Sequence, residues 1–140
     1  MSYAVRLVEV VLGNEVKEGG PVVGAPSDAA RILCELIGGK DRENFVVLHL
    51  DARHRVVSAE IVSVGSLSSV PVHPREIFKA AILANAHGII CGHNHPSGDV
   101  SPSWEDQQMC EKLVAAGLLL GLPVLDFLVV AREERWVSVM

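Results

Sequence analysis

Apolar residues recur along the chain with two different spacings, and these spacings predict strands and helices. Short runs rich in valine, isoleucine and leucine, some alternating with polar residues, predict strands over residues 3–12, 43–50, 55–64, 88–92, 124–130 and 135–139. Apolar residues three and four positions apart predict helices over residues 26–37, 74–86 and 103–116. This order of elements predicts a mixed sheet with helices against it, an α/β or α+β fold.

Glycine-rich and polar segments mark where these elements end. Gly13 and Asn14 predict a turn after the first strand, and residues 51–54 predict the turn of an antiparallel hairpin. Residues 65–72 are expected to form a loop, and Gly117 and the segment Gly121-Leu122-Pro123 are expected to form the break after the third helix. The residues expected to face the core from the first two helices are Ile32, Leu33, Leu36, Ile37, Ile77, Phe78, Ala81 and Ile82.

The composition favours one compact domain that spans residues 1–140. Hydrophobic residues make up 49% of the 140 residues, which is ample for a buried core. No apolar run approaches the roughly 18 to 20 residues that are needed to cross a bilayer, and no secretory leader is evident. We therefore expect a cytoplasmic protein without a membrane partner.

The strongest chemical signal is the segment HNHP at residues 93–96, followed by a serine and an aspartate in the next predicted helix. Residues two apart in a strand point to the same face, so His93 and His95 aim their imidazoles at one point. Ser103 opens a helix whose first turn brings Asp106 toward that point. Two imidazoles and one carboxylate leave a fourth tetrahedral position for water, as in catalytic zinc sites.

Ser103 and Asp106 have a second interpretation, because a serine with an acidic residue three positions later also forms a helix capping box. The two residues alone do not decide between capping and metal binding. The two histidines that precede them favour the metal site, since capping explains neither histidine.

Three cysteines, Cys34, Cys91 and Cys110, lie in apolar contexts at spacings unlike those of zinc ribbons, which predicts buried free thiols. Cys91 lies two residues before His93 and has a second interpretation as a nucleophile or a soft metal ligand. Against that interpretation, a thiolate at this place would fill the coordination position that a catalytic zinc leaves open for water.

The spacing of His93, His95, Ser103 and Asp106 resembles the JAMM motif of JAB/MPN-type zinc metalloproteases, and the string HNHPSGDVSPSWED resembles the RadC family within that superfamily. Further similar stretches, which together cover the chain from about Ser27 to near its end, are ENFVVLHLDARHRVV, VHPREIFKAAILANA and LPVLDFLVV. The resemblance implies a JAB/MPN-like mixed sheet sandwiched by helices, with a cytidine-deaminase-like architecture. It also implies a single RadC-like domain, without the helix-hairpin-helix module that full-length relatives carry ahead of it.

An attacking water needs a proton acceptor, and the three candidate ligands cannot serve because their lone pairs would be on the metal. The sequence offers three other carboxylates in or beside the predicted elements, Glu43, Glu60 and Glu76. The resemblance assigns the role to Glu43, an acidic residue that opens an apolar strand upstream of the histidines, with Glu60 as the main alternative.

The activity that the resemblance implies is zinc-dependent hydrolysis of a peptide or isopeptide bond. Zinc lowers the pKa of a bound water toward about 7 and polarises the carbonyl under attack. Glu43 would take the proton of the water and deliver it to the leaving amine, and Ser103 would hydrogen-bond the developing oxyanion. The expected partner is a peptide or protein substrate.

The main alternative is a nucleic-acid role, because RadC-like proteins carry a DNA-repair label. The chain has 12 basic against 17 acidic residues, a net charge of −5, so DNA binding is expected to be weak. A local basic patch could form from Arg53, Arg55, Arg75 and Lys79. A zinc nucleobase deaminase would need H-x-E and P-C-x-x-C motifs, which the sequence lacks. A non-catalytic scaffold would be expected to have a degenerate motif, whereas all four motif positions are intact.

Overall fold

The structure, a computed structural model, describes residues 20–65 and 72–140. The strand predicted over residues 3–12 and the turn predicted at Gly13 and Asn14 lie outside the described residues, as does most of the loop predicted over residues 65–72. The other predicted strands and helices are present, with small shifts in their bounds.

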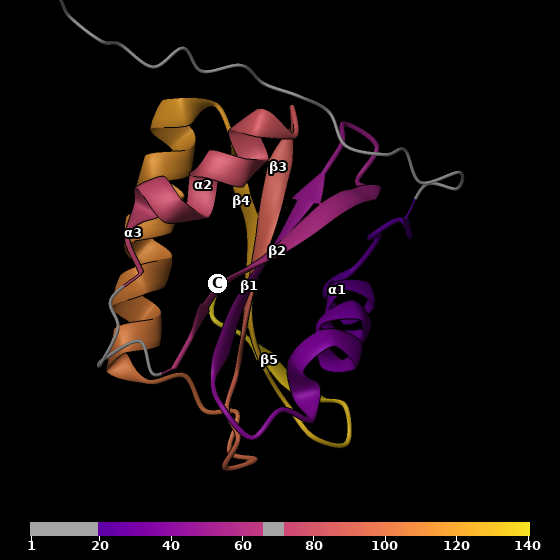
Figure 1. The fold of residues 1–140 in the computed structure, drawn as a ribbon, viewed down its shortest axis with the longest axis vertical. Coiled ribbons are helices and arrows are strands. Elements are labelled where there is room, and N and C mark those ends of the chain that lie inside the picture. Colours follow the sequence, from indigo (N-terminus) through magenta and orange to yellow (C-terminus); the bar gives the residue numbers. More distant parts are fainter. Residues whose placement is uncertain (1–19, 66–71) are drawn as a thin grey trace, which may run out of the picture.

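Helices and strands follow one another along the described part of the chain (Figure 1). Their bounds are α1 Pro26–Leu33, the π-helical turn η1 Cys34–Gly38, β1 Asn44–Leu50, β2 Val56–Val64, α2 Pro74–Leu83, β3 Gly88–Asn94, α3 Trp104–Leu120, β4 Val124–Ala131 and β5 Arg135–Ser138. None of these described helices combines the length and the apolar character needed to cross a bilayer.

The strands form one mixed sheet in the order β2-β1-β3-β4-β5. β1 runs antiparallel to both β2 and β3, so the predicted hairpin is confirmed and the start of β1 lies beside the end of β3. β3 and β4 are parallel, and α3 makes the connection between them across one face of the sheet. His93 therefore lies in the central strand, with Phe45 of β1 on one side and Val129 of β4 on the other.

Helices cover both faces of the sheet, and a separate hydrophobic cluster fills each interface (Figure 1). On one face, Leu33 and Ile37 of α1 and η1 pack against alternate strand residues, which are Val46, Leu48, Leu50, Ile90, Leu128 and Val130. On the other face, Ile77, Phe78 and Leu113 of α2 and α3 pack against the intervening residues, which include Phe45, Val47, Ile89, Cys91 and Phe127. This alternation confirms the predicted α/β sandwich of one sheet between helices.

Some expectations about helix ends and helix faces are wrong. α3 continues one turn beyond the predicted end and stops at Gly121, whose φ of 70° suits a left-handed C-cap. Gly117 serves close packing instead of ending the helix, since a Cβ there would lie 2.4 Å from the carbonyl oxygen of Leu122. Leu36 and Ile82 are 42% and 51% exposed, because the π-helical turn alters the spacing around Leu36 and Ile82 lies in the last turn of α2.

Candidate metal centre

His93 and His95 extend from the C-terminal end of the central strand. The backbone N–H of His95 donates to the carbonyl of Val130 at 2.9 Å, so pairing with β4 continues one residue beyond the end of β3. Residues two apart in an extended chain point to the same side. The two imidazole rings lie edge to face with their centroids 5.0 Å apart, and they converge as the strand spacing predicts.

Asp106 comes from the first turn of α3, where it also caps the helix. Its backbone N–H donates to Ser103 Oγ at 3.0 Å, and the backbone N–H of Ser103 donates to Asp106 Oδ2 at 2.8 Å. These reciprocal bonds form the capping box considered from the sequence. They also fix the orientation of the carboxylate while using only one of its oxygens, so capping and metal binding are compatible.

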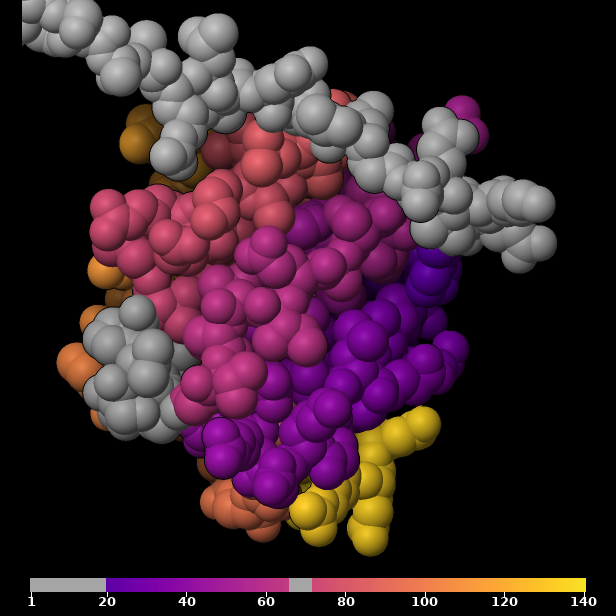
Figure 2. Space-filling view, in the orientation of Figure 1, coloured from indigo at the N-terminus to yellow at the C-terminus, as the bar shows by residue number. Residues whose placement is uncertain are grey.

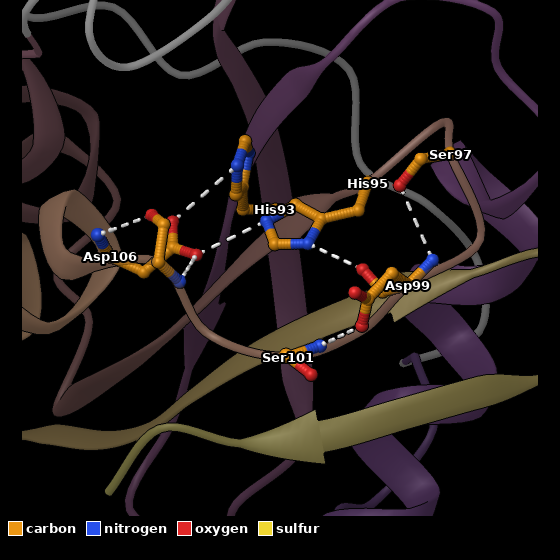
Figure 3. Close-up of polar contacts among 7 residues, drawn as sticks. His93, His95, Ser97, Asp99, Ser101 and Asp106 are labelled. Carbon is orange, nitrogen blue, oxygen red and sulfur yellow. Dashed lines mark hydrogen bonds and ion pairs between the residues drawn. The ribbon is translucent and has the colours of Figure 1, made fainter.

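The two imidazoles and the carboxylate meet at one point (Figure 3). Nε2 of His95 lies 3.1 Å from Asp106 Oδ2, and Nε2 of His93 lies 3.5 Å from Asp106 Oδ1. One ligand atom from each residue lies within 4.8 Å of the others. Within residues 20–65 and 72–140, this is the one cluster of histidine, cysteine and acidic side chains that could hold a metal ion.

The donor atoms of this cluster suit a divalent cation. Asp106 is fully buried, and its Oδ1 has no hydrogen-bond partner in the described structure; the same is true of Nδ1 of His93. A buried carboxylate oxygen without a hydrogen bond costs free energy, and a cation at this place would remove that cost. Two imidazoles and one carboxylate are common zinc ligands that leave a fourth position open.

The surroundings give the three side chains different protonation behaviour. Burial lowers the pKa of His93, although the charges of Asp106 and Glu43 act in the opposite direction. The hydrogen bond with Asp106 raises the pKa of His95. Burial alone would raise the pKa of Asp106, but hydrogen bonds from His95 and the Ser103 backbone outweigh burial and lower that pKa. Asp106 is thus ionised and His93 neutral at neutral pH, and these are the forms that bind metals.

The loop between β3 and α3 fixes the orientation of His95. The backbone carbonyl of Asp99 lies 2.8 Å from His95 Nδ1, which favours a proton on Nδ1 and turns Nε2 toward Asp106. The loop is itself braced, because the backbone N–H of Ser101 donates to Asp99 Oδ1 at 2.9 Å (Figure 3). Sequence reasoning missed this contact, since a backbone carbonyl leaves no signal in the residue types.

The structure separates the three carboxylates considered as proton acceptors. Glu43 directly precedes β1, two residues before Phe45, which pairs with His93. Its charge partly offsets the lowering of the His93 pKa by burial and adds to the rise of the His95 pKa that the hydrogen bond with Asp106 causes, so Glu43 lies near both histidines. Glu60 is in β2, and β1 separates that strand from β3. Glu76 is exposed in α2 and pairs with Lys79 at 3.2 Å. This arrangement favours Glu43 over its two alternatives.

Cys91 does not belong to the ligand cluster. It is fully buried among apolar residues that include Phe45 and Phe127, and burial raises the pKa of its thiol far above the ordinary value. A protonated thiol in an apolar core acts as a small hydrophobic group, so its second interpretation as nucleophile or ligand is not supported. Cys91 and Cys110 are buried free thiols as predicted, whereas Cys34 is only partly buried.

Three segments that are far apart in the sequence gather at the end of the sheet that carries the cluster. They are the turn before β1 (purple), the loop between β3 and α3 (orange) and the hairpin between β4 and β5 (yellow), all at the lower end in Figures 1 and 2. A Cβ on Gly98 of the loop would lie only 3.8 Å from the guanidinium of Arg135 at the start of β5. The cluster is therefore bordered by loops that rest on a rigid sheet, a common arrangement for functional sites.

A mixed sheet between helices, with two histidines and an aspartate gathered at the end of its central strand, defines an α/β domain with a possible metal site. The sequence model of the RadC-like JAB domain matches residues 23–140. The chain belongs to this family, which confirms the resemblance drawn from the motif.

Relatives support this assignment. A UPF0758 protein of Rubrobacter xylanophilus is 46% identical over 112 residues, which cover 80% of this chain and 49% of the relative. A UPF0758 protein of Methanosarcina mazei is 40% identical over 123 residues, or 88% of this chain and 53% of the relative. A UPF0758 protein of Shouchella clausii is 42% identical over 117 residues, which cover 84% of this chain and 51% of the relative. The chain spans about half the length of these relatives.

Proposed function

We propose that this domain is a zinc-dependent hydrolase that cleaves a peptide or isopeptide bond. The observation that carries the proposal is the buried convergence of His93, His95 and Asp106, with no hydrogen-bond partner for Asp106 Oδ1 in the described structure. Membership of the RadC-like JAB family supports the proposal, since the JAMM motif that these residues resemble is that of zinc metalloproteases.

His93, His95 and Asp106 would hold the metal. When bound, zinc supplies Lewis acidity, which polarises a substrate carbonyl and acidifies water. Burial keeps His93 neutral, and the capping box holds the Asp106 carboxylate in place. The ligands are therefore oriented in advance, which lowers the cost of assembling the site.

Glu43 is the general base of this proposal. Its side chain is partly exposed at the entrance to β1, and its charge acts on both histidines of the cluster. Glu43 would take the proton of the attacking water and then deliver it to the leaving amine. Because it is not one of the clustered ligands, its lone pairs are free for this transfer.

Ser103 is proposed to stabilise the oxyanion that develops on the carbonyl. Its Oγ accepts a hydrogen bond from the backbone N–H of Asp106, so its own hydroxyl proton is available to donate. Its position at the N-cap of α3 adds the positive end of the helix dipole. A single preorganised donor of this kind typically contributes about 100 to 1,000-fold in rate.

Metal analysis of protein purified without chelator tests the proposed zinc site. We expect about one zinc per chain in the parent and almost none in His95→Ala. Asp106→Asn is the sharper variant, because an amide oxygen can still accept the capping bond but lacks the charge that favours a cation. Glu76→Gln, which changes an exposed carboxylate in α2, is the control and should keep its zinc. Equal zinc contents in all four proteins would contradict the proposal.

A screen of the parent against peptides and ubiquitin-like isopeptide conjugates tests the reaction. Hydrolysis that depends on zinc and disappears in Asp106→Asn is the expected result. Zinc bound at about one per chain, without hydrolysis of any substrate in the screen, would support the metal site and argue against the hydrolase.

A further inference from the structure

Asn94, the residue between the two histidines, is polar and yet fully buried. Side chains alternate along β3, so Asn94 points to the face opposite His93 and His95. Its amide reaches the segment that leads into β1. Asn94 Oδ1 accepts a hydrogen bond from the backbone N–H of Asn44, and Asn94 Nδ2 donates to the carbonyl of Arg42 at 3.0 Å.

Only one orientation of the Asn94 amide satisfies both contacts. A backbone N–H can only donate and a backbone carbonyl can only accept, so the oxygen must face Asn44 and the nitrogen must face Arg42. An apolar side chain at this position would leave both backbone groups without these partners. The amide is therefore a specific link between β3 and the residues on either side of Glu43.

The backbone of Glu43 is held from two sides. Its carbonyl accepts a hydrogen bond of 2.6 Å from the backbone N–H of Gly65, the residue directly after β2. On the other side, the backbone pairing of β1 with β3 stops at Phe45, which lies opposite His93. The Asn94 amide carries the connection beyond that pair, where backbone pairing between β1 and β3 has ended.

We propose that Asn94 is a positioning residue for the general base. It holds residues 42–44 so that the Glu43 carboxylate lies beside the cluster of His93, His95 and Asp106. The proposal rests on the role of Glu43 in the proposed function. It gives Asn94 a part in the reaction although its side chain points away from the ligands and contacts backbone atoms instead.

Crystal structures of the full chain and of Asn94→Leu give a test that needs no substrate. Leucine branches at the same carbon, with bulkier methyl groups, and makes no hydrogen bonds, so β3 and the ligands should stay in place while residues 42–44 shift. The distance from the Glu43 carboxylate to His95 Nε2 should increase. Asn44→Ala is the matched control, because it removes the bond from Asn44 Nδ2 to the same Arg42 carbonyl, 2.8 Å long, but keeps both bonds of Asn94.

An unmoved Glu43 in Asn94→Leu would overturn the proposal, and so would an equal displacement in Asn44→Ala. Asn94→Ala supplies the same comparison if leucine does not fit. Hydrogen exchange of the backbone amides in solution is an independent measure of how firmly residues 42–44 are held. Exchange of the Asn44 amide should accelerate at least about tenfold in Asn94→Leu, while that of Val47 in the middle of β1 is unchanged.

If the parent cleaves a substrate, kcat and KM for that substrate can distinguish a positioning role of Asn94 from a purely structural one. Asn94→Leu should bind as much zinc as the parent and keep KM within about twofold, with kcat at least about tenfold lower. Added to Glu43→Gln, it should cause no further loss, because both changes remove the same base. Lost zinc, or losses that multiply in the double variant, would contradict a role through Glu43. If the parent cleaves nothing, the proposed function fails, and the crystal structures still decide whether Asn94 positions Glu43.

Discussion

Asp106 meets two structural demands with one side chain. Oδ2 completes the capping box with Ser103, while Oδ1 faces His93 and has no hydrogen-bond partner in the described structure. The N-terminal end of α3 stabilises the negative charge that the proposed metal binding needs, whereas the capping bond needs only an acceptor oxygen. An alanine at this position would therefore disturb the start of the helix as well as the ligand set, and only asparagine separates the two effects.

Replacing Glu43 with glutamine is expected to separate metal binding from chemistry. Glutamine has nearly the same shape but cannot accept the proton, so zinc content should stay at the parent level while hydrolysis falls about 100 to 10,000-fold. Metal analysis and rates on one verified substrate measure the two quantities. Glu60→Gln is the control and should be nearly neutral, since β1 separates its strand from β3. An inactive, zinc-bound Glu60→Gln beside an active Glu43→Gln would reassign the base.

His49 is a titratable group buried outside the metal cluster. It lies in β1, is 2% exposed, and its Nδ1 lies 2.6 Å from Ser58 Oγ. Its Nε2 is buried without a hydrogen-bond partner in the described structure. Burial lowers the pKa of His49, so the folded protein holds this imidazole in its neutral form.

This burial predicts a loss of stability in mild acid. Below the unfolded pKa of about 6.5, the unfolded chain takes up a proton at His49 that the folded chain does not, so the free energy of unfolding decreases as pH falls. The contribution of one such group is at most about 1.4 kcal/mol per pH unit. Urea unfolding between pH 7.5 and 5.5 should show a smaller pH dependence in His49→Gln than in the parent. His87→Gln, which changes an exposed imidazole, serves as the control, and equal slopes in all three proteins would exclude this effect.

The candidate ligands could be predicted from the sequence because metal binding needs particular side chains at a particular spacing. His93, His95 and Asp106 satisfy that requirement on a strand and the following helix. Asp99 and Asn94 could not be predicted in the same way. Asp99 acts through its carbonyl, and Asn94 acts on the backbone of a distant segment, so the contacts depend on tertiary structure and not on a local pattern.

At the scale of elements, periodicity predicted which segments are strands and helices but not how the helices end. The continuous apolar runs of β1, β3 and β4 reflect strands that are buried on both faces. Gly117 resembled a helix end because glycine is a poor helix former. It lies inside α3 because the carbonyl of Leu122 approaches it so closely that no side chain fits there. Leu36 was misplaced because a π-helical turn has no signature in the 3.6-residue pattern.

The contact between α1 and the ligand strand depends on a glycine. A Cβ on Gly92 would lie 2.5 Å from both δ carbons of Leu33, which is fully buried. Gly92→Ala is therefore expected to destabilise the domain by about 1 to 3 kcal/mol. Combined with Leu33→Ala, which removes the clashing atoms, it should cost less than the sum of the two single changes. Urea unfolding of the four proteins measures this coupling, and strictly additive losses would contradict the steric explanation.

At the scale of the whole molecule, charge argues against a strong nucleic-acid surface. The net charge is −5, and two of the basic residues considered for a patch have partners within the protein. The guanidinium of Arg55 donates to the carbonyl of Gly20, and Lys79 pairs with Glu76. Arg53 and Arg55 also follow β1, at the end of the sheet opposite the metal cluster.

We therefore expect the domain to bind duplex DNA weakly and with little dependence on salt. Few phosphates would be neutralised, so few counterions would be released. Fluorescence anisotropy with a labelled duplex between about 50 and 200 mM salt measures both quantities. A steep loss of affinity over that range, abolished by replacing Arg53 and Arg55 with alanine, would favour the nucleic-acid function over the hydrolase.

All three candidate ligands fall within residues 93–106, whereas Glu43 lies far earlier in the chain and reaches them only through the pairing of β1 with β3. Closing the short segment from β3 to α3 costs little chain entropy, and bringing the two strands together costs more. If His93, His95 and Asp106 hold zinc as proposed, a chain that has formed only this strand, loop and helix would already present the whole ligand set. Metal binding and the proposed hydrolysis would then become possible at separate stages of folding, and a chain that had bound zinc before β1 paired with β3 would still lack its general base.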